Sequence, residues 1–140
     1  MSKTLIICEK GRVASAVAQA LSVGHGNNGI WENADWVVAA ARGHLLELAP
    51  PAFYDARYAE WRLEDLPIIP SEFKFQANDD GQDRLKKLHD QIGRTDVTAI
   101  VNACDAAREG ELIFKTILHT APVGSEKPVR RAWFASLTPD

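Results

Sequence analysis

The fold is decided by one stretch of sequence, VTAIVNACDAAREGELIFKTILH at residues 97–119. Its first seven residues are mostly apolar and rich in β-branched side chains, which predicts a strand buried on both faces of a sheet. A turn follows at residues 105–108, and from Glu109 apolar residues recur at helical spacing to about His119. The residues expected to face the core are Leu112, Ile113, Ile117 and Leu118.

The same pattern of a buried strand running into a helix opens the chain. Residues 4–8 (TLIIC) predict a second buried strand, and the following apolar periodicity predicts a helix over about 12–21. Further along, we expect a hairpin over 30–41, a helix from about 81 to 92 and a last strand over 129–134. Parallel strands joined by helices form one sheet, so the predicted class is α/β, a Rossmann-like fold with a mostly parallel central sheet, helices on both faces and the inserted hairpin.

Between the hairpin and the next helix lies an irregular, proline-containing stretch over residues 48–78. A structureless connection of this length is unusual inside a compact domain. We interpret it as an ordered, aromatic-rich excursion held by contacts between aromatic side chains. Those side chains are Phe53, Tyr54, Tyr58, Trp61, Phe73 and Phe75.

Length and composition describe an ordinary globular domain. With 140 residues, 46% hydrophobic and 25% charged, the chain fits one domain that can bury a core. The formal charge of -3 argues against a protein that binds DNA through overall positive charge. An acidic site can still bind phosphate through a cation that it holds. Cys8 and Cys104 lie in apolar stretches and are expected to be buried thiols of a reducing compartment. The opening apolar run is too short for a signal peptide or a membrane span, so we expect a cytoplasmic protein without a membrane partner.

Acidic side chains follow both buried strands, at the point where each strand ends. Glu9 comes directly after the first strand, Asp105 follows the second, and Glu109 and Glu111 come soon after. Ligands of open α/β sheets bind beyond the carboxyl ends of the strands. If the two strands are neighbours, Glu9, Asp105 and Glu109 converge, and clustered carboxylates suit Mg²⁺. Singly, each acid is better explained as a solvated or helix-opening residue; together they favour a metal site.

Four further residues next to these acids are candidates for the same site. Lys10 and Arg108 can hold a phosphate that the acids would repel, or can simply balance surface charge. His44 can donate to phosphate or pack at a strand end. Gly110 lowers helix stability between two glutamates, which indicates a close backbone approach or a tight turn.

In five segments the chain resembles type IA DNA topoisomerases, particularly the topoisomerase III branch. In family order they are LIICEK at 5–10, RGHL at 42–45, Trp61 with LPIIP at 66–70, NACDAAREGELIF at 102–114 and RRAWFASLT at 130–138. A lone DxxRE would be a weak signal, whereas five ordered segments across nearly the whole chain are a strong one. Two positions depart from the family: Ala107 replaces the middle acid of Asp-x-Asp-x-Glu, and Gly11-Arg12 replaces a frequent Pro-Ser. The first departure implies weaker or single-metal binding.

The resemblance implies a Toprim fold for residues 1–140 and a place at the N-terminus of a longer topoisomerase. Thr138 and Pro139 also predict the start of a further helix. Carried over by position, the family's catalytic roles fall on Glu9, Lys10 and Arg108. The resemblance assigns Mg²⁺ to Glu9, Asp105 and Glu109. It makes His44 and Glu111 supporting residues near the DNA backbone. Glu9 would be the general acid/base that protonates the leaving 3′ oxygen, and Lys10 would contact the scissile phosphate.

The family reaction cuts and reseals single DNA strands through a 5′-phosphotyrosine link. Its tyrosine lies in another domain, so we expect this chain to act on DNA, mainly single-stranded, only within the full-length enzyme and to be inactive alone. One alternative is the Toprim domain of a primase or nuclease, which would not be expected to share the LPIIP and Trp-x-Ser segments. Another is a non-enzymatic, receiver-like module that binds magnesium, disfavoured because no lysine ends the last strand.

Overall fold

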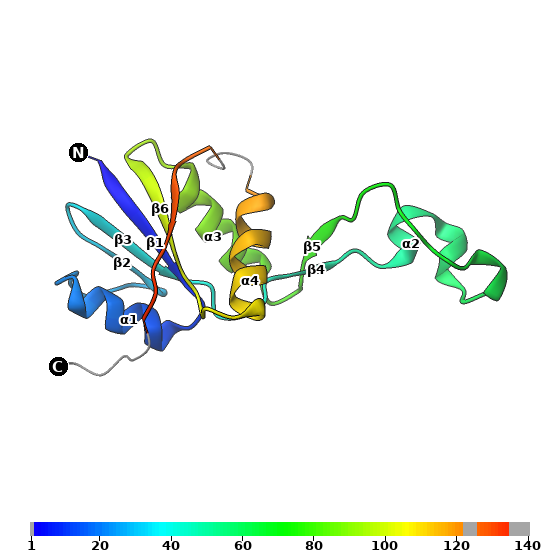
Figure 1. Cartoon of the computed structure of the whole chain (residues 1–140), viewed down its shortest axis with the longest axis horizontal. Helices are drawn as coiled ribbons and strands as arrows, with labels where there is room; N and C mark the ends of the chain where they lie inside the picture. The colour runs from blue at the N-terminus through cyan, green and yellow to red at the C-terminus, as the bar shows by residue number, and fades with distance from the viewer. Residues whose placement is uncertain (1, 122–125, 135–140) are drawn as a thin grey trace.

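A five-stranded sheet forms the centre of the protein, in the order β2–β3–β1–β6–β7 (Figure 1). This computed structural model describes residues 2–121 and 126–134, so the helix expected to start at Thr138 lies outside the described residues. The strands are β1 (Lys3–Cys8), β2 (Ile30–Glu32), β3 (Trp36–Ala40), β6 (Val97–Ala103) and β7 (Val129–Arg131). The pairings β3–β1, β1–β6 and β6–β7 are parallel, and β2 joins β3 as the antiparallel half of the predicted hairpin. The mostly parallel α/β sheet is therefore confirmed.

The core lies on both faces of the sheet, because successive side chains of a strand point to opposite sides. Leu5 and Ile7 of β1 belong to the cluster on one face, and Ile6 and Cys8 belong to the cluster on the other. The first cluster is covered by α3 (Gln82–Gly93) and α4 (Arg108–His119), and the second is covered by α1 (Gly11–Ala20). The chain thus contains a complete two-sided core of its own.

The prediction that Leu112 of α4 faces the core was wrong. Leu112 is half exposed, whereas Phe114 is buried together with Ile113 and Ile117. The buried positions are spaced by one, three and four residues along one helix stripe, and Leu112 lies outside that stripe. The last strand is also shorter than predicted, since β7 ends at Arg131.

Both cysteines are buried and free, as predicted. Burial raises the pKa of the Cys8 thiol and of the Cys104 thiol to about 12. Both groups are therefore neutral packing residues at ordinary pH, with little thiolate available for reaction.

Arg84 is a buried cation that ties α3 to the end of β3. Its guanidinium donates to the carbonyl oxygen of Ala40, and also to those of Asn28 (2.6 Å) and Gly29 (2.8 Å). Burial lowers the pKa of Arg84 to about 10, because the charged form loses solvation. Sequence reasoning missed this residue, since a buried arginine and a surface arginine look alike in a helical pattern.

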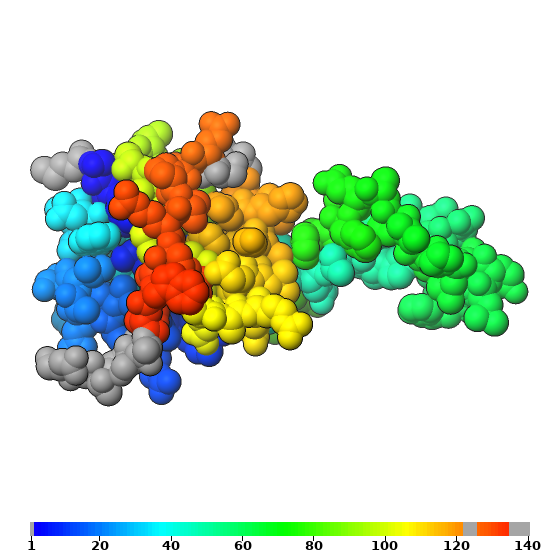
Figure 2. All heavy atoms as spheres, in the orientation of Figure 1, coloured from blue at the N-terminus to red at the C-terminus, as the bar shows by residue number. Residues whose placement is uncertain are grey.

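The predicted excursion is an arm that projects away from the rest of the molecule (Figures 1 and 2). At its base, β4 (Leu46–Leu48) pairs antiparallel with β5 (Phe75–Ala77), and we call this pair the neck. The arm proper, residues 49–74, contains the short helix α2 (Pro51–Tyr54). Two 3₁₀ turns follow, at Ala56–Ala59 and Leu63–Asp65.

The expectation that aromatic contacts hold the arm together is confirmed for Tyr54 and Phe75 and wrong for Trp61 and Phe53. Trp61 is 82% exposed, and Phe53 meets only its neighbour Tyr54 in an edge-on contact at 5.5 Å between ring centroids. Two hydrogen bonds order the base of the arm: Ala49 N donates to Lys74 O (2.8 Å), and Lys74 N donates to the side-chain hydroxyl of Tyr54 (2.7 Å). A single layer of chain offers too few neighbours for aromatic rings to be buried.

Among the residues that the structure describes, no helix has both the length and the apolar character that crossing a membrane requires.

Candidate functional site

Three parallel strands end at the same edge of the sheet, and each is followed by a candidate residue. Cys8, the last residue of β1, lies beside Ala40 of β3 on one side and beside Ala103 of β6 on the other. Glu9 therefore emerges between the loop that carries His44 and the loop that carries Asp105. The prediction that the two acid-bearing strands are neighbours is confirmed.

Lys10 links the two carboxylates that follow these strands. Its Nζ lies 2.9 Å from Asp105 Oδ2 and 3.3 Å from Glu9 Oε1. The hydrogen bond to Asp105, followed by that to Glu9, raises the pKa of Lys10, so the ammonium stays charged throughout the neutral range. The Glu9 side chain is only 7% exposed, and its Oε2 has no hydrogen-bond partner among the described residues.

The backbone around Glu9 is fixed by a sharp bend after β3. Arg42 and Gly43 both have positive φ, 70° and 97°, which turns the chain so that two successive amides face Glu9. Arg42 N donates to Glu9 O at 2.8 Å and Gly43 N donates to the same oxygen at 3.2 Å. These bonds hold the start of the β1–α1 loop in place without using the Glu9 carboxylate.

Glu109 has a different partner. Its Oε1 lies 3.2 Å from Nε2 of His44, and both side chains are exposed. In the described part of the chain, no three His, Cys, Asp or Glu side chains are grouped closely enough to hold a metal ion. The structure thus brings Glu9 and Asp105 together and pairs Glu109 with His44, while a site shared by all three acids stays a prediction.

Gly110 allows α4 to start directly against the Asp105 loop. A Cβ on this glycine would lie 2.2 Å from Asp105 O and 2.8 Å from Asp105 N. The close backbone approach predicted for Gly110 is therefore confirmed. Within the loop, Ala107 N donates to Asp105 O at 2.8 Å, and Ala107 leaves no carboxylate at the position between Asp105 and Glu109.

A polar network lies beneath the Asp105 loop. Arg131 donates to Cys104 O at 2.9 Å and lies 2.5 Å from Glu111 Oε1. Asn102 donates to the same Glu111 oxygen (3.3 Å) and accepts from Cys104 N (3.1 Å). Glu111, predicted as a supporting residue near DNA, thus contacts Arg131 and Asn102 of the protein itself. The Arg108 side chain is exposed and makes no hydrogen bond or ion pair to other described residues. Sequence reasoning gave no role to Asn102 or Arg131, which lie in matching segments but carry no recognisable spacing signal.

The chemistry of this edge fits a hard divalent cation. Carboxylate oxygens are the ligands that Mg²⁺ prefers, and one of them, Glu9 Oε2, is buried without a partner in the described structure. The space between Glu9 and Asp105 already attracts a positive charge, since Lys10 lies there. A metal ion at this edge would compete with the Lys10 ammonium for the same two carboxylates.

A mostly parallel α/β sheet with charged side chains beyond its carboxyl edge defines a Rossmann-like domain, the class in which ligands bind at that edge. The profile of the Toprim domain family matches residues 4–137, and the chain belongs to that family. It is also similar to two proteins named DNA topoisomerase 3, from Staphylococcus aureus strain USA300 (43% identity over 136 residues, 97% of this chain) and from Bacillus cereus strain ATCC 10987 (38% over 138 residues, 99%). The chain spans 19% of the length of each relative. These matches confirm the predicted Toprim fold and the resemblance to topoisomerase III.

Proposed function

We propose that residues 1–140 form the Toprim domain at the N-terminus of a cytoplasmic type IA topoisomerase of the topoisomerase III kind. The parent enzyme would cut and reseal DNA, mainly single-stranded, through a 5′-phosphotyrosine. The observation that carries the proposal is the meeting of Glu9 and Asp105, from neighbouring strand ends, at Lys10. The 43% identity to a DNA topoisomerase 3 supports the same assignment.

Glu9 is the proposed proton donor and acceptor. When the tyrosine oxygen attacks phosphorus and the bond to the 3′ oxygen breaks, the leaving oxygen takes a proton from the Glu9 carboxylic acid. The tyrosine hydroxyl loses its own proton to solvent as its oxygen bonds to phosphorus. On resealing, the 3′ hydroxyl returns its proton to the Glu9 carboxylate as it attacks phosphorus, and the departing tyrosine oxygen regains a proton from solvent. The buried position of Glu9 keeps bulk water from competing for this transfer.

Lys10 and Arg108 are the proposed phosphate contacts. The Lys10 ammonium is already held at the edge by Asp105 and Glu9, and a charge-assisted bond to the scissile phosphate would replace one of these contacts. The exposed Arg108 side chain, at the start of α4, is free to meet the adjoining DNA backbone, and His44, which contacts the next residue, Glu109, has a supporting role.

Glu9, Asp105 and Glu109 would hold Mg²⁺. When bound, the ion neutralises phosphate charge and helps position the 3′ oxygen for resealing. Glu109 would have to exchange its His44 contact for this role. Because Ala107 supplies no carboxylate, we expect weak binding of a single ion by the isolated chain.

Isothermal titration of the chain with Mg²⁺, and with Mn²⁺ as a second probe, tests this site. We expect Glu9→Gln and Asp105→Asn to weaken binding roughly tenfold or more, the scale of losing a carboxylate that binds or orients a metal. Glu47→Gln is the matched control, since Glu47 is an exposed acid on the neck, and it should bind like the wild type. Equal binding by all four proteins would overturn the metal assignment.

Relaxation of negatively supercoiled DNA tests whether this domain needs the other domains of the enzyme for activity. The isolated chain should be inactive because the nucleophilic tyrosine belongs to another domain. A chimera with this chain in place of the matching 19% of the S. aureus enzyme should relax DNA and should lose that activity with Glu9→Gln. Divalent-dependent cleavage of DNA or RNA by the chain alone would instead favour a nuclease or primase role.

A further inference from the structure

The arm displays apolar side chains that nothing in the described chain covers. None of residues 50–80, all of which the structure describes, is buried. Within residues 50–80, the large apolar residues with at least half their surface exposed are Phe53, Trp61, Leu63, Leu66, Ile69 and Phe73. Single exposed hydrophobic residues are normal, but a concentration of them on one projecting segment marks an interaction surface.

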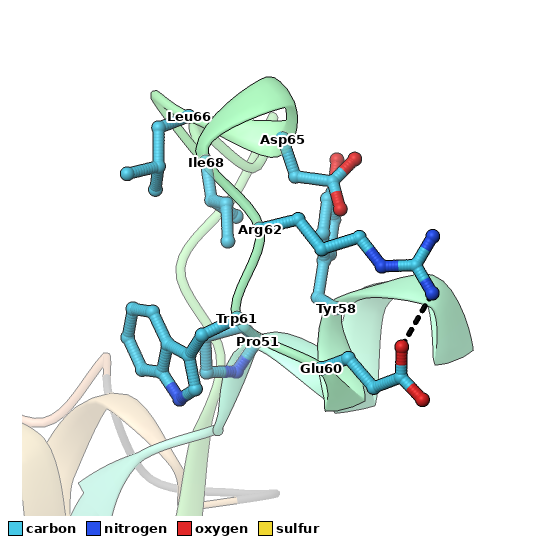
Figure 3. Close-up of a pocket in the computed structure, with 8 residues that line it drawn as sticks. All are labelled: Pro51, Tyr58, Glu60, Trp61, Arg62, Asp65, Leu66 and Ile68. Atoms are coloured by element: carbon cyan, nitrogen blue, oxygen red, sulfur yellow. Dashed lines mark hydrogen bonds and ion pairs between the residues drawn. The ribbon is translucent and has the colours of Figure 1, made fainter.

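Three apolar side chains at the outer part of the arm lie apart from two charged ones. In Figure 3, Trp61, Leu66 and Ile68 lie on one side of the chain, while Glu60 and Arg62 lie on the other. A separate hollow of about 280 Å³ is lined by Tyr54, Asp55, Tyr58, Ile68, Ile69, Pro70 and Ser71.

The charges of the arm exclude nucleic acid as the natural occupant. Residues 49–74 carry three basic residues against five acidic ones. All three basic residues are paired within the arm: Arg57 with Asp55 and Asp65, Arg62 with Glu60, and Lys74 with Glu72. A segment of net negative charge whose cations are paired in this way offers little to a polyanion. The chemistry that remains is apolar contact with another protein surface.

The arm is already ordered before any partner arrives. The neck pairs Leu46 with Ala77 and Leu48 with Phe75, and the Tyr54 hydroxyl accepts from the Lys74 amide just beyond it. A preorganised surface loses little conformational entropy on docking, so a modest apolar patch suffices. Covalent linkage to the partner lowers the required area further, because the effective concentration is high.

We infer that the apolar face of the arm docks against the part of a topoisomerase 3-type polypeptide that this chain does not span. The inference rests on the proposed function, in which this domain is one part of such an enzyme. The relatives devote 19% of their length to the matching region, so most of the polypeptide would fold beside this domain. The arm extends away from the five-stranded sheet and its helices, which we call the body (Figure 2). Its surface is therefore accessible to a neighbouring domain.

Hydrogen exchange of arm amides tests the inference, comparing the 140-residue chain with the chimera described above. We expect residues 50–73 to exchange roughly tenfold more slowly, or slower still, in the chimera. The double variant Trp61→Ser, Leu63→Ser should restore fast exchange, since loss of an interface anchor costs on the order of tenfold or more in binding. Val129→Ser is the matched control, because Val129 is also exposed but lies on β7, and it should leave the protection intact.

Several results would overturn the docking role. These are equal exchange in chain and chimera, protection that survives the double variant, and protection of the isolated chain that grows with its concentration or with added single-stranded DNA. Protection that grows with concentration would assign the face to a second copy, and protection that grows with added single-stranded DNA would assign it to nucleic acid. The cation titration separates this inference from the proposed function: intact Mg²⁺ binding with an unprotected arm defeats the docking role alone, and a protected arm without Mg²⁺ binding defeats the metal role alone.

Discussion

Lys10 occupies the place between two carboxylates where a metal ion is proposed to bind. Its ammonium contacts Glu9 and Asp105 and remains charged at neutral pH, so it opposes a second cation. We predict that Lys10→Met binds Mg²⁺ roughly two- to fivefold more tightly, the modest effect expected of a partly exposed ion pair. Isothermal titration at fixed ionic strength measures the change.

Lys86→Met is a suitable control for this measurement. Lys86 pairs with Asp90 on the outside of α3, so its loss changes the net charge equally without touching the site. If both variants bind Mg²⁺ alike, the effect is one of overall charge and Lys10 does not compete for the acids.

Gly110 offers a test of how tightly α4 abuts the Asp105 loop. Alanine there would place a methyl group 2.2 Å from Asp105 O, so the loop must move. We expect Gly110→Ala to lower the free energy of unfolding by about 1–3 kcal/mol, as overpacking usually does. In Gly93→Ala the new methyl meets nothing within 4 Å, so this control should be neutral or more stable. Urea denaturation of both variants decides the matter, and equal stability would refute the close-packing argument.

Individual site residues could be predicted where their position alone fixes their environment. Glu9 and Asp105 directly follow buried parallel strands, and Gly110 interrupts a helix start, so each carries a local signal. Arg84 and Arg131 carry none, because their partners are mainly backbone carbonyls or residues brought near by tertiary folding. The pairing of His44 with Glu109 likewise depends on loop geometry that no spacing rule encodes.

At the scale of elements, Arg94 joins the segments at the opposite edge of the sheet. Its guanidinium donates to Glu32 at the end of β2 and to Asp96 just before β6. Hydrogen bonds from Arg94 lower the pKa of Glu32, where Lys3 also contributes, and that of Asp96, each to about 2. Because the folded-state pKa values are depressed, these contacts stabilise the protein above pH 4.5, the ordinary value for glutamate, and fade as pH falls toward 2.

Arg94→Met should therefore lower the Tm by roughly 3–5 °C at pH 6. The gap to the wild type should narrow below pH 4.5 and close near pH 2. Thermal unfolding followed by circular dichroism across this range checks both points. Arg62→Met, which breaks an exposed pair on the arm, should show no such pH-dependent gap. A constant difference for Arg94→Met would contradict the linkage to Glu32 and Asp96.

Most strands and helices of the body could be predicted from the spacing of apolar residues, because burial of one or two faces of an element requires that spacing. The error at Leu112 shows the limit of that rule, since adjacent apolar residues on a helix cannot all face the core. The arm shows a second limit of prediction from sequence, which concerns the partner of an apolar side chain. Aromatic residues indicate contact, but sequence does not say whether Trp61 contacts this domain or another.

At the scale of the whole molecule, the body and the arm should be separable. No residue of the described segment 50–80 is buried, so the two-sided core owes little to the arm. Replacing residues 50–73 by a short glycine-serine turn should leave cooperative unfolding intact and the Tm within about 5 °C of the wild type. A change that small corresponds to about 1–2 kcal/mol in a domain of this size. Loss of the cooperative transition in a calorimetric scan would show that the arm is part of the folding unit.

The root of the arm lies at the acidic edge. Only Leu45 separates His44 from β4. Asn78, just past β5, donates from its side-chain Nδ2 to His44 O and from its backbone N–H to Leu45 O. The backbone of His44, whose imidazole contacts Glu109 at 3.2 Å, is therefore held by hydrogen bonds from the end of the neck. The arm and the candidate site are thus built on the same short stretch of chain, which joins β4 to the side chain that contacts the third proposed metal ligand.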